Sequence, residues 1–112
     1  MVDRNYTVDG RNLIVELHGE LDHHVAEEIR EEIDAAINQN SIKNVIFNFK
    51  NINFMDSSGV GVVIGRYRIV SKLGGKVAIT NLNPQVKRIL DLSGMNKIIQ
   101  IYDTCEEAIS SL

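Results

Sequence analysis

The pattern of hydrophobic and polar residues predicts strands and helices in alternation. Residues 4–9 and 12–17 alternate with a period of two, and Asp9-Gly10 between them is typical of a β-hairpin, because glycine adopts a positive φ without strain. In residues 23–39 valine or isoleucine recurs at every fourth position and charged residues occupy the other side, which predicts an amphipathic helix. Asp22 stands where the N-cap of this helix is expected.

The second half of the chain continues the alternation. The pattern predicts a strand over 45–49, a helix from about Ser58 to Leu73, a strand over 76–80, a helix from Pro84 to Gly94, a strand over 98–101 and a last helix from Thr104 to Leu112. The predicted order is therefore β-β-α-β-α-β-α-β-α. Strand–helix–strand units of this length make right-handed parallel crossovers, so we expect an α/β domain with a mixed, mostly parallel sheet.

Composition and charge exclude some classes of function but do not identify the function. The 112 residues carry 12 basic and 15 acidic side chains, a net charge of −3, so no direct contact with nucleic acid is expected. The longest apolar run, Val60 to Ile64, is far shorter than the ~20 residues that span a bilayer, so no membrane contact is expected. A single cysteine and a polar N-terminus predict a cytoplasmic protein. We expect residues 1–112 to form a single domain.

Motifs for catalysis, metals and cofactors are weak. No P-loop is present, and the glycines of residues 59–65 do not have the spacing of a dinucleotide fingerprint. Residues 55–59 resemble a nucleophile elbow, but the first glycine is missing and no histidine follows in the chain. The neighbouring His23 and His24 would project about 100° apart on a helix, which disfavours a shared metal. We therefore expect no catalysis, no metal and no cofactor.

The start of the second predicted helix is unusual in its glycine content. Gly59, Gly61 and Gly65 lie in its first two turns, and each costs a helix interior about 1 kcal/mol relative to alanine. Such a sequence favours a backbone that another surface approaches closely, and that surface is either the protein's own sheet or a partner. Val60 and Ile64 would form an apolar strip on this helix.

The serines at this helix start also suit a phosphorylation switch. Ser57 and Ser58 follow Asp56 where free backbone N–H groups and the helix dipole favour an anion. A phosphate would add −1.5 to −2 charge units beside the apolar strip, and burying that charge against a partner is unfavourable. The fold would be retained while binding is lost. These arguments leave open which of the two serines is modified.

Residues 54–67, which read Phe-Met-Asp-Ser-Ser-Gly-Val-Gly-Val-Val-Ile-Gly-Arg-Tyr, resemble the signature of the anti-sigma factor antagonists of the STAS domain family. Residues 19–24 are similar to the family's loop after the second strand, and residues 84–94 to its third helix. The likeness covers about residues 4–111. The combination of Leu-Asp-His-His with Met-Asp-Ser-Ser-Gly and Gly-Arg-Tyr is most similar to the sporulation branch of the family.

The resemblance implies a STAS fold, with about five strands and about four helices, and a partner-switching function. In that family the unphosphorylated antagonist binds an anti-sigma factor that is also a serine kinase, and a sporulation sigma factor is released. The kinase modifies the first serine of the signature, which carries over to Ser57, and a PP2C-type serine phosphatase reverses the modification. The matching positions around this serine are Asp22, Asp56, Ser58 and Gly59. We expect the partner to bind the surface formed by Gly59, Val60, Gly61, Ile64 and Arg68.

Two further functions remain open at this point. A general-stress antagonist shares the fold and the Asp-Ser-Ser/Thr-Gly signature, so the sigma factor pathway is less firmly implied than the mechanism. A nucleotide-binding STAS module is the other alternative, because a glycine-rich helix start can hold a phosphate. The loop itself contains no Lys or Arg, which disfavours that alternative.

Overall fold

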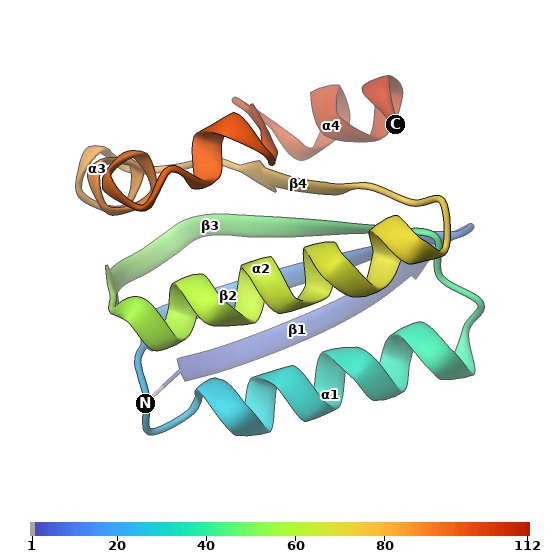
Figure 1. Ribbon diagram of the computed structural model, residues 1–112, viewed down its shortest axis with the longest axis horizontal. Coiled ribbons are helices and arrows are strands. Elements are labelled where there is room, and N and C mark those ends of the chain that lie inside the picture. The colour runs from blue at the N-terminus through green and yellow to red at the C-terminus, as the bar shows by residue number, and fades with distance from the viewer. Residues whose placement is uncertain (1) are drawn as a thin grey trace.

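The computed structural model describes residues 2–112 and shows the predicted order of strands and helices (Figure 1). The elements are β1 (Val2–Asp9), β2 (Asn12–Leu21), α1 (Ala26–Gln39), β3 (Asn44–Met55), α2 (Ser57–Lys72), β4 (Val77–Thr80), α3 (Pro84–Ser93), a 3-10 turn η1 (Met95–Lys97), β5 (Gln100–Tyr102) and α4 (Cys105–Ser111). The turn η1 is the one element of this part of the chain that the hydrophobic pattern did not predict.

The strands form a sheet in the order β1-β2-β3-β4-β5. β1 pairs antiparallel with β2 through the predicted hairpin, in which Gly10 has a φ of 61°. The other neighbouring pairs are parallel, each joined by a crossover helix. The expected α/β fold with a mixed, mostly parallel sheet is confirmed.

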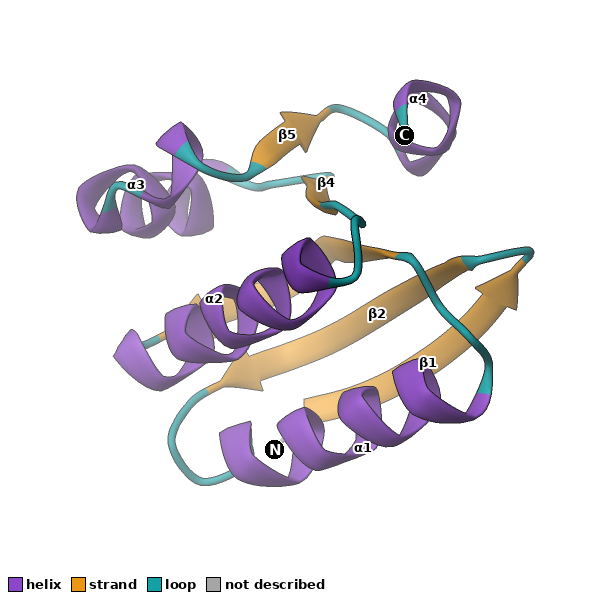
Figure 2. Cartoon of the chain, turned by 45° about the vertical axis from the view of Figure 1, so that its right-hand side comes forward, coloured by secondary structure: helices purple, strands orange, loops and turns teal. Residues whose placement is uncertain are grey.

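Side chains alternate between two faces of the sheet, and different helices cover the two faces. Leu13, Val15 and Phe47 belong to the main core, which α1 and α2 cover with their apolar sides (Figure 2). Ile46, between two residues of that core in β3, points to the other face and packs with Ala108 of α4. Since helices lie on both faces, the central strands are buried on both sides, as parallel sheets normally are.

β2 and β3 are longer than the sequence pattern predicts. β2 continues past Leu17 to Leu21, because Gly19 adopts a φ of 106° beside a register shift and the strand bends instead of ending. β3 continues past Phe49 to Met55, and beyond its last pairing with β4 it follows β2 alone. This extension carries the start of α2 away from the middle of the sheet.

The start of α1 and the bounds of β5 also differ from the prediction. α1 begins at Ala26 and has Val25 as its N-cap, so Asp22 is not the cap of this helix. Residues 23–25 instead form a turn, in which the carbonyl oxygen of Asp22 accepts from the N–H groups of Val25 and Ala26. The last strand is Gln100–Tyr102, because the N–H groups of residues 98 and 99 bond back to Met95 in the turn η1.

Candidate functional site at the start of the second helix

The extensions of β2 and β3 place two loops next to each other. Leu21 and Met55 are the last paired residues of these parallel strands, and the N–H of Asp56 donates to the carbonyl oxygen of Leu21 at 3.4 Å. The loop that leads to α1 and the first turn of α2 are therefore neighbours. Parallel strands commonly present functional groups at their carboxyl ends, and the predicted site residues lie there.

The carboxylate of Asp56 holds this region together. Its Oδ1 accepts from the N–H groups of Ser58 at 2.9 Å and Gly59 at 3.3 Å, so Asp56 is the N-cap of α2. Its Oδ2 accepts from the N–H of His23 at 3.1 Å, in the loop before α1. One side chain thus connects the starts of both helices. Asp56, and neither of the two serines that follow it, is the residue that caps α2.

Asp22 makes its hydrogen bond within its own loop, the one that leads to α1. Its Oδ1 accepts from the N–H of His24 at 3.0 Å, which closes the turn before α1. The imidazole rings of His23 and His24 are tilted by 35° to each other, with ring centroids 4.0 Å apart. Each ring has its own carboxylate: Nδ1 of His23 is 3.5 Å from Asp56, and Nδ1 of His24 is 3.5 Å from Asp22. Residues 2–112 contain no cluster of three or more potential metal ligands.

Both carboxylates are ionised at neutral pH. Burial by itself raises the pKa of Asp56, but donation from the N–H groups of Gly59, His23 and Ser58 outweighs burial and holds the pKa below its ordinary value of 3.8. The pKa of Asp22 is also lowered, since hydrogen bonds from His24 outweigh the effect of burial. The two loops therefore carry two negative charges before any modification, and that of Asp56 lies at the start of α2.

The two serines differ in accessibility. Ser57 is the first residue of α2 and is exposed. Ser58 is half-buried and lines a groove of about 350 Å³ between α1 and α2, together with His23, Glu27, Arg30, Gly61 and others. No physical argument from the sequence separates these serines. Their exposure now favours Ser57 as the hydroxyl that another protein reaches.

The structure also separates the three glycines. A Cβ at Gly59 would lie 2.6 Å from the side chain of Met55 and 2.7 Å from the carbonyl oxygen of Leu21. Gly59 is therefore required by packing against the protein's own strands, and it is buried. A Cβ at Gly61 or Gly65 would meet no atom within 4 Å. Internal packing does not explain these two glycines.

The predicted binding strip lies along the outer side of α2. Val60 and Ile64 are half-buried and rest partly on the core, Gly61 and Arg68 are exposed, and all four follow the helical repeat from Ser57. Gly59 is placed beneath this surface. The structure thus brings the predicted phosphorylation site and four of the five predicted contact residues onto one side of one helix.

Sequence reasoning missed a buried ion pair that fixes α2 against α1. Arg66 is only 4% exposed, and its Nε lies 2.8 Å from Oδ1 of Asp34 in α1. The N–H vector is not directed at that oxygen, so charge and not an aligned hydrogen bond joins the pair. The sequence did contain a signal that Arg66 is buried. Arg66 lies four residues after Val62 and four before Val70, on the buried side of α2.

Comparison with known proteins settles the family. The STAS domain family model matches residues 3–108, nearly the whole chain. The chain belongs to this family. An anti-sigma F factor antagonist of Paenibacillus polymyxa is 45% identical over 100 residues, which cover 89% of this chain and 86% of that protein. The anti-sigma-B factor antagonist of Bacillus subtilis is 32% identical over 95 residues, or 85% of each chain.

Solved structures of a STAS protein agree with this assignment. The anti-sigma factor antagonist SpoIIAA in its unphosphorylated form matches 97% of this chain and 95% of its own, with 37% identity and a TM-score of 0.86. The Bacillus cell fate determinant SpoIIAA in its phosphorylated form matches 97% of this chain and 98% of its own, with 36% identity and a TM-score of 0.76. The expected resemblance to anti-sigma factor antagonists is confirmed.

The relatives also bear on the class of activity. They are antagonists of anti-sigma factors, and this STAS protein is likewise a regulatory domain and not an enzyme. Within residues 2–112, every helix is too short or too polar to cross a membrane.

The lowered pKa of Asp56 predicts a pH dependence of stability. Because the folded pKa lies below the unfolded one, the ionised cap stabilises the fold above about pH 4, and this contribution is lost as the pH falls through the folded pKa. Asp56→Ala should lower the free energy of unfolding by about 1–2 kcal/mol near neutral pH. Urea unfolding should show the gap to the parent narrowing as the pH falls below about 4. Asp3→Ala, which removes an exposed carboxylate of β1, should show no such gap; an Asp56→Ala deficit that stays constant with pH would contradict the assignment.

Proposed function

We propose that this STAS protein is an anti-sigma factor antagonist that is switched off by phosphorylation of Ser57. The unphosphorylated protein binds an anti-sigma factor that is also a serine kinase, and a sporulation sigma factor is released. The kinase modifies Ser57, and a PP2C-type serine phosphatase restores the active form. The names of the relatives and the existence of SpoIIAA in both phosphorylation states support this proposal.

The observation that carries the proposal is the position of Ser57. It is exposed, it is the first residue of α2, and it is followed along the helix by Gly61, where the backbone is uncovered. A kinase needs a hydroxyl that it can reach, and a docking partner needs a surface next to that hydroxyl. Both requirements are met within one turn of α2. The half-buried Ser58 contributes to the groove beside it.

The docking surface consists of Val60, Gly61, Ile64 and Arg68, with the groove between α1 and α2 beside it. Gly61 lines this groove and carries no side chain that would fill it. A partner backbone or small side chain can therefore approach α2 closely at this point. Gly59 supports the surface from beneath by allowing α2 to pack against Leu21.

A phosphate on Ser57 would act through its charge. Asp56 already accepts from the N–H groups of Ser58 and Gly59, so fewer donors are left for a phosphate than a bare helix start would offer. The phosphate would remain in water beside the ionised Asp56 and Asp22. A partner that docks here would have to desolvate three negative groups together, which strongly disfavours the complex. The backbone of α2 need not move.

Among the alternatives, the general-stress pathway has weaker support than sporulation. The Bacillus subtilis anti-sigma-B factor antagonist is 32% identical, against 45% for the anti-sigma F factor antagonist of Paenibacillus polymyxa. A nucleotide-binding function is also less well supported, because Arg30, the arginine in the groove, lies 3.4 Å from Glu27. We further propose that residues 1–112 act as one STAS domain in the cytoplasm.

The phosphorylation site can be tested with two serine variants. Ser57→Ala should block incorporation of phosphate when the protein is mixed with a kinase anti-sigma factor and ATP, followed by mass spectrometry. Because Asp56 and not Ser57 caps α2, this variant should lose less than about 0.5 kcal/mol of unfolding free energy. Ser58→Ala is the matched control and should still be modified. Full phosphorylation of Ser57→Ala together with none of Ser58→Ala would move the site by one residue.

The docking surface can be tested at the uncovered glycines. Gly61→Ala should raise the stability of α2 by up to about 1 kcal/mol, because alanine favours the helix and meets no atom within 4 Å, yet it should weaken binding to the anti-sigma factor. Gly65→Ala, whose Cβ would likewise meet no atom within 4 Å but which does not line the groove, controls for the helix effect. Calorimetric titration and thermal unfolding measure both quantities. Unchanged affinity in Gly61→Ala would place the interface elsewhere.

The charge mechanism makes a prediction about the phosphorylated protein itself. Amide chemical shifts should change around Asp22, Asp56 and residues 57–59 and remain the same elsewhere, because the cap of α2 stays in place. Ser57→Asp, with a single negative charge, should weaken binding less than a phosphate does. Shift changes that extend to the hairpin at Gly10 or to α4 would show that the domain rearranges, and the charge mechanism would be wrong.

A further inference from the structure

The end of the molecule opposite the candidate site is basic. The hairpin turn, the loop from α1 to β3 and the loop from α2 to β4 meet there, at the amino ends of the strands (right-hand side of Figure 1). The N–H of Lys43 donates to the carbonyl oxygen of Arg11 at 2.8 Å, and the carbonyl oxygen of Lys76 accepts from the N–H of Val45 at 3.0 Å. Within residues 9–11, 40–43 and 72–76 the acidic residue is Asp9. We call this surface the basic end, and its side chains are Arg11, Lys43, Lys72 and Lys76.

The four basic side chains are available to a partner. All four residues are exposed. In the described part of the chain, the lysine and arginine side chains that pair with carboxylates are Arg4, Arg30 and Arg66, which lie elsewhere. Arg11 donates from Nε to the carbonyl oxygen of Ser41, and its other donors and its charge remain free. The positive charge of this end is therefore not neutralised within the fold.

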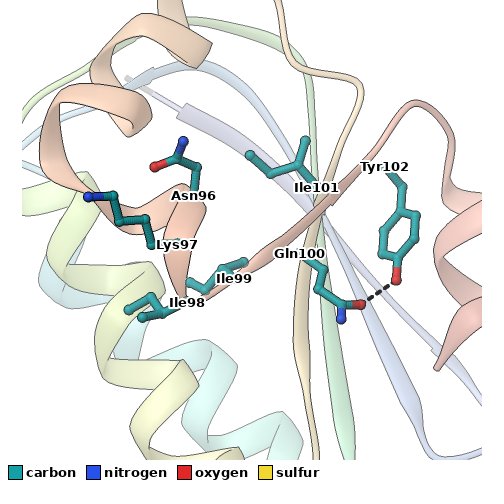
Figure 3. A pocket seen from close by; sticks show the side chains of 7 residues that line it. All are labelled: Asn96, Lys97, Ile98, Ile99, Gln100, Ile101 and Tyr102. Carbon is teal, nitrogen blue, oxygen red and sulfur yellow. Dashed lines mark hydrogen bonds between the residues drawn. The ribbon is translucent and has the colours of Figure 1, made fainter.

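Exposed apolar side chains lie among these charges. Leu73, directly after the last residue of α2, is 60% exposed, and Val8, beside the hairpin turn, is 46% exposed. Ile98 is also exposed; it lines a groove of about 210 Å³ together with Lys76, and the groove of about 600 Å³ shown in Figure 3 together with Lys97. Unpaired basic residues around exposed apolar side chains are typical of surfaces that bind an anionic membrane.

The net charge of −3 does not prevent such a contact, because the opposite charges are far apart. The ionised Asp56 lies at the start of α2 and Lys72 at its end, and a helix of 16 residues is about 24 Å long. The Debye length at physiological ionic strength is about 8 Å. An anionic surface at the basic end is therefore screened from the acidic site by about three Debye lengths.

We propose that the basic end binds the anionic surface of a membrane, with Leu73 entering the boundary between head groups and acyl chains. The expectation of no membrane contact rested on the lack of a spanning segment, and this contact requires none. A membrane fits better than a nucleic acid, because phosphates alone would leave Leu73 in water. It fits better than an acidic protein, because a lysine is a point charge on a flexible stem and suits a fluid layer of head groups.

Membrane binding in this orientation leaves the proposed switch accessible. Ser57 is the first residue of α2 and Lys72 the last, so the phosphorylation site would point away from the bilayer. The proposal goes beyond the proposed function, and neither depends on the other. Four basic residues and one leucine give a weak contact that depends on salt.

The first test is co-flotation of the full chain with vesicles made of equal parts of phosphatidylglycerol and phosphatidylcholine. The protein should bind in about 50 mM salt, bind much less in about 500 mM salt and not bind phosphatidylcholine alone. Lys72→Gln and Lys76→Gln should each lower the partition coefficient about fivefold. Lys87→Gln and Arg88→Gln remove exposed charges of α3 and, as matched controls, should leave the partition coefficient unchanged.

The second test follows Leu73 directly, because the chain contains no tryptophan. The fluorescence of Leu73→Trp should shift to shorter wavelength when the anionic vesicles are added. Leu92→Trp, at an exposed position of α3, is the matched control and should show no shift. Leu73→Ser should lower the partition coefficient about tenfold and keep its dependence on salt, because an apolar contact is lost and no charge is changed.

Several outcomes would overturn the proposal. One is no binding to the anionic vesicles at low salt, and another is an emission of Leu73→Trp that does not shift. Equal losses in the lysine variants and the α3 controls would also contradict it. Binding to double-stranded DNA that Lys72→Gln and Lys76→Gln weaken, without binding to vesicles, would assign the basic end to a nucleic acid instead. Phosphorylation of Ser57 measured without vesicles should be unchanged in all these variants, so the proposed function is tested separately.

Discussion

The site of this STAS protein depends on one carboxylate that is shared between two loops. Asp56 caps α2 with one oxygen and holds the loop before α1 with the other, through the N–H of His23. Both oxygens of this carboxylate accept hydrogen bonds, and Asp56 is the N-cap of α2. The hydroxyl of the exposed Ser57 beside it is therefore not needed to cap the helix. The same residue thus fixes the geometry of the site and supplies the negative charge that a phosphate would have to join.

Most of the fold could be predicted because it depends on local signals. The order of elements follows from hydrophobic periodicity, and Asn83, Gly94 and Thr104 mark helix ends as expected: Asn83 and Thr104 accept from the N–H groups three residues later, and Gly94 has a φ of 76°. These signals act within a few residues, so the sequence displays them directly.

The parts that could not be predicted depend on contacts between distant segments. The extension of β3 to Met55 follows from its pairing with β2, and the role of Gly59 follows from the approach of Leu21, 38 positions earlier in the chain. Arg66 stands at a buried position of the α2 pattern, but its partner Asp34 in α1 can be identified only once the two helices are packed. For the same reason, sequence patterns alone left Ser57 and Ser58 equivalent, while burial separates them.

The bond between Asp56 and His23 has a consequence for the timing of the switch during synthesis and folding. It joins residues 33 positions apart in the sequence, and the backbone hydrogen bond from Asp56 to Leu21 has a similar sequence separation. Contacts with such sequence separations form only after β2, α1 and β3 have docked. Closing the intervening loop costs conformational entropy, and only the contacts of the completed sheet offset that cost. Under the proposed function, a kinase that recognises the assembled helix start would therefore not modify nascent or misfolded chains, and only completely folded molecules would be subject to the switch.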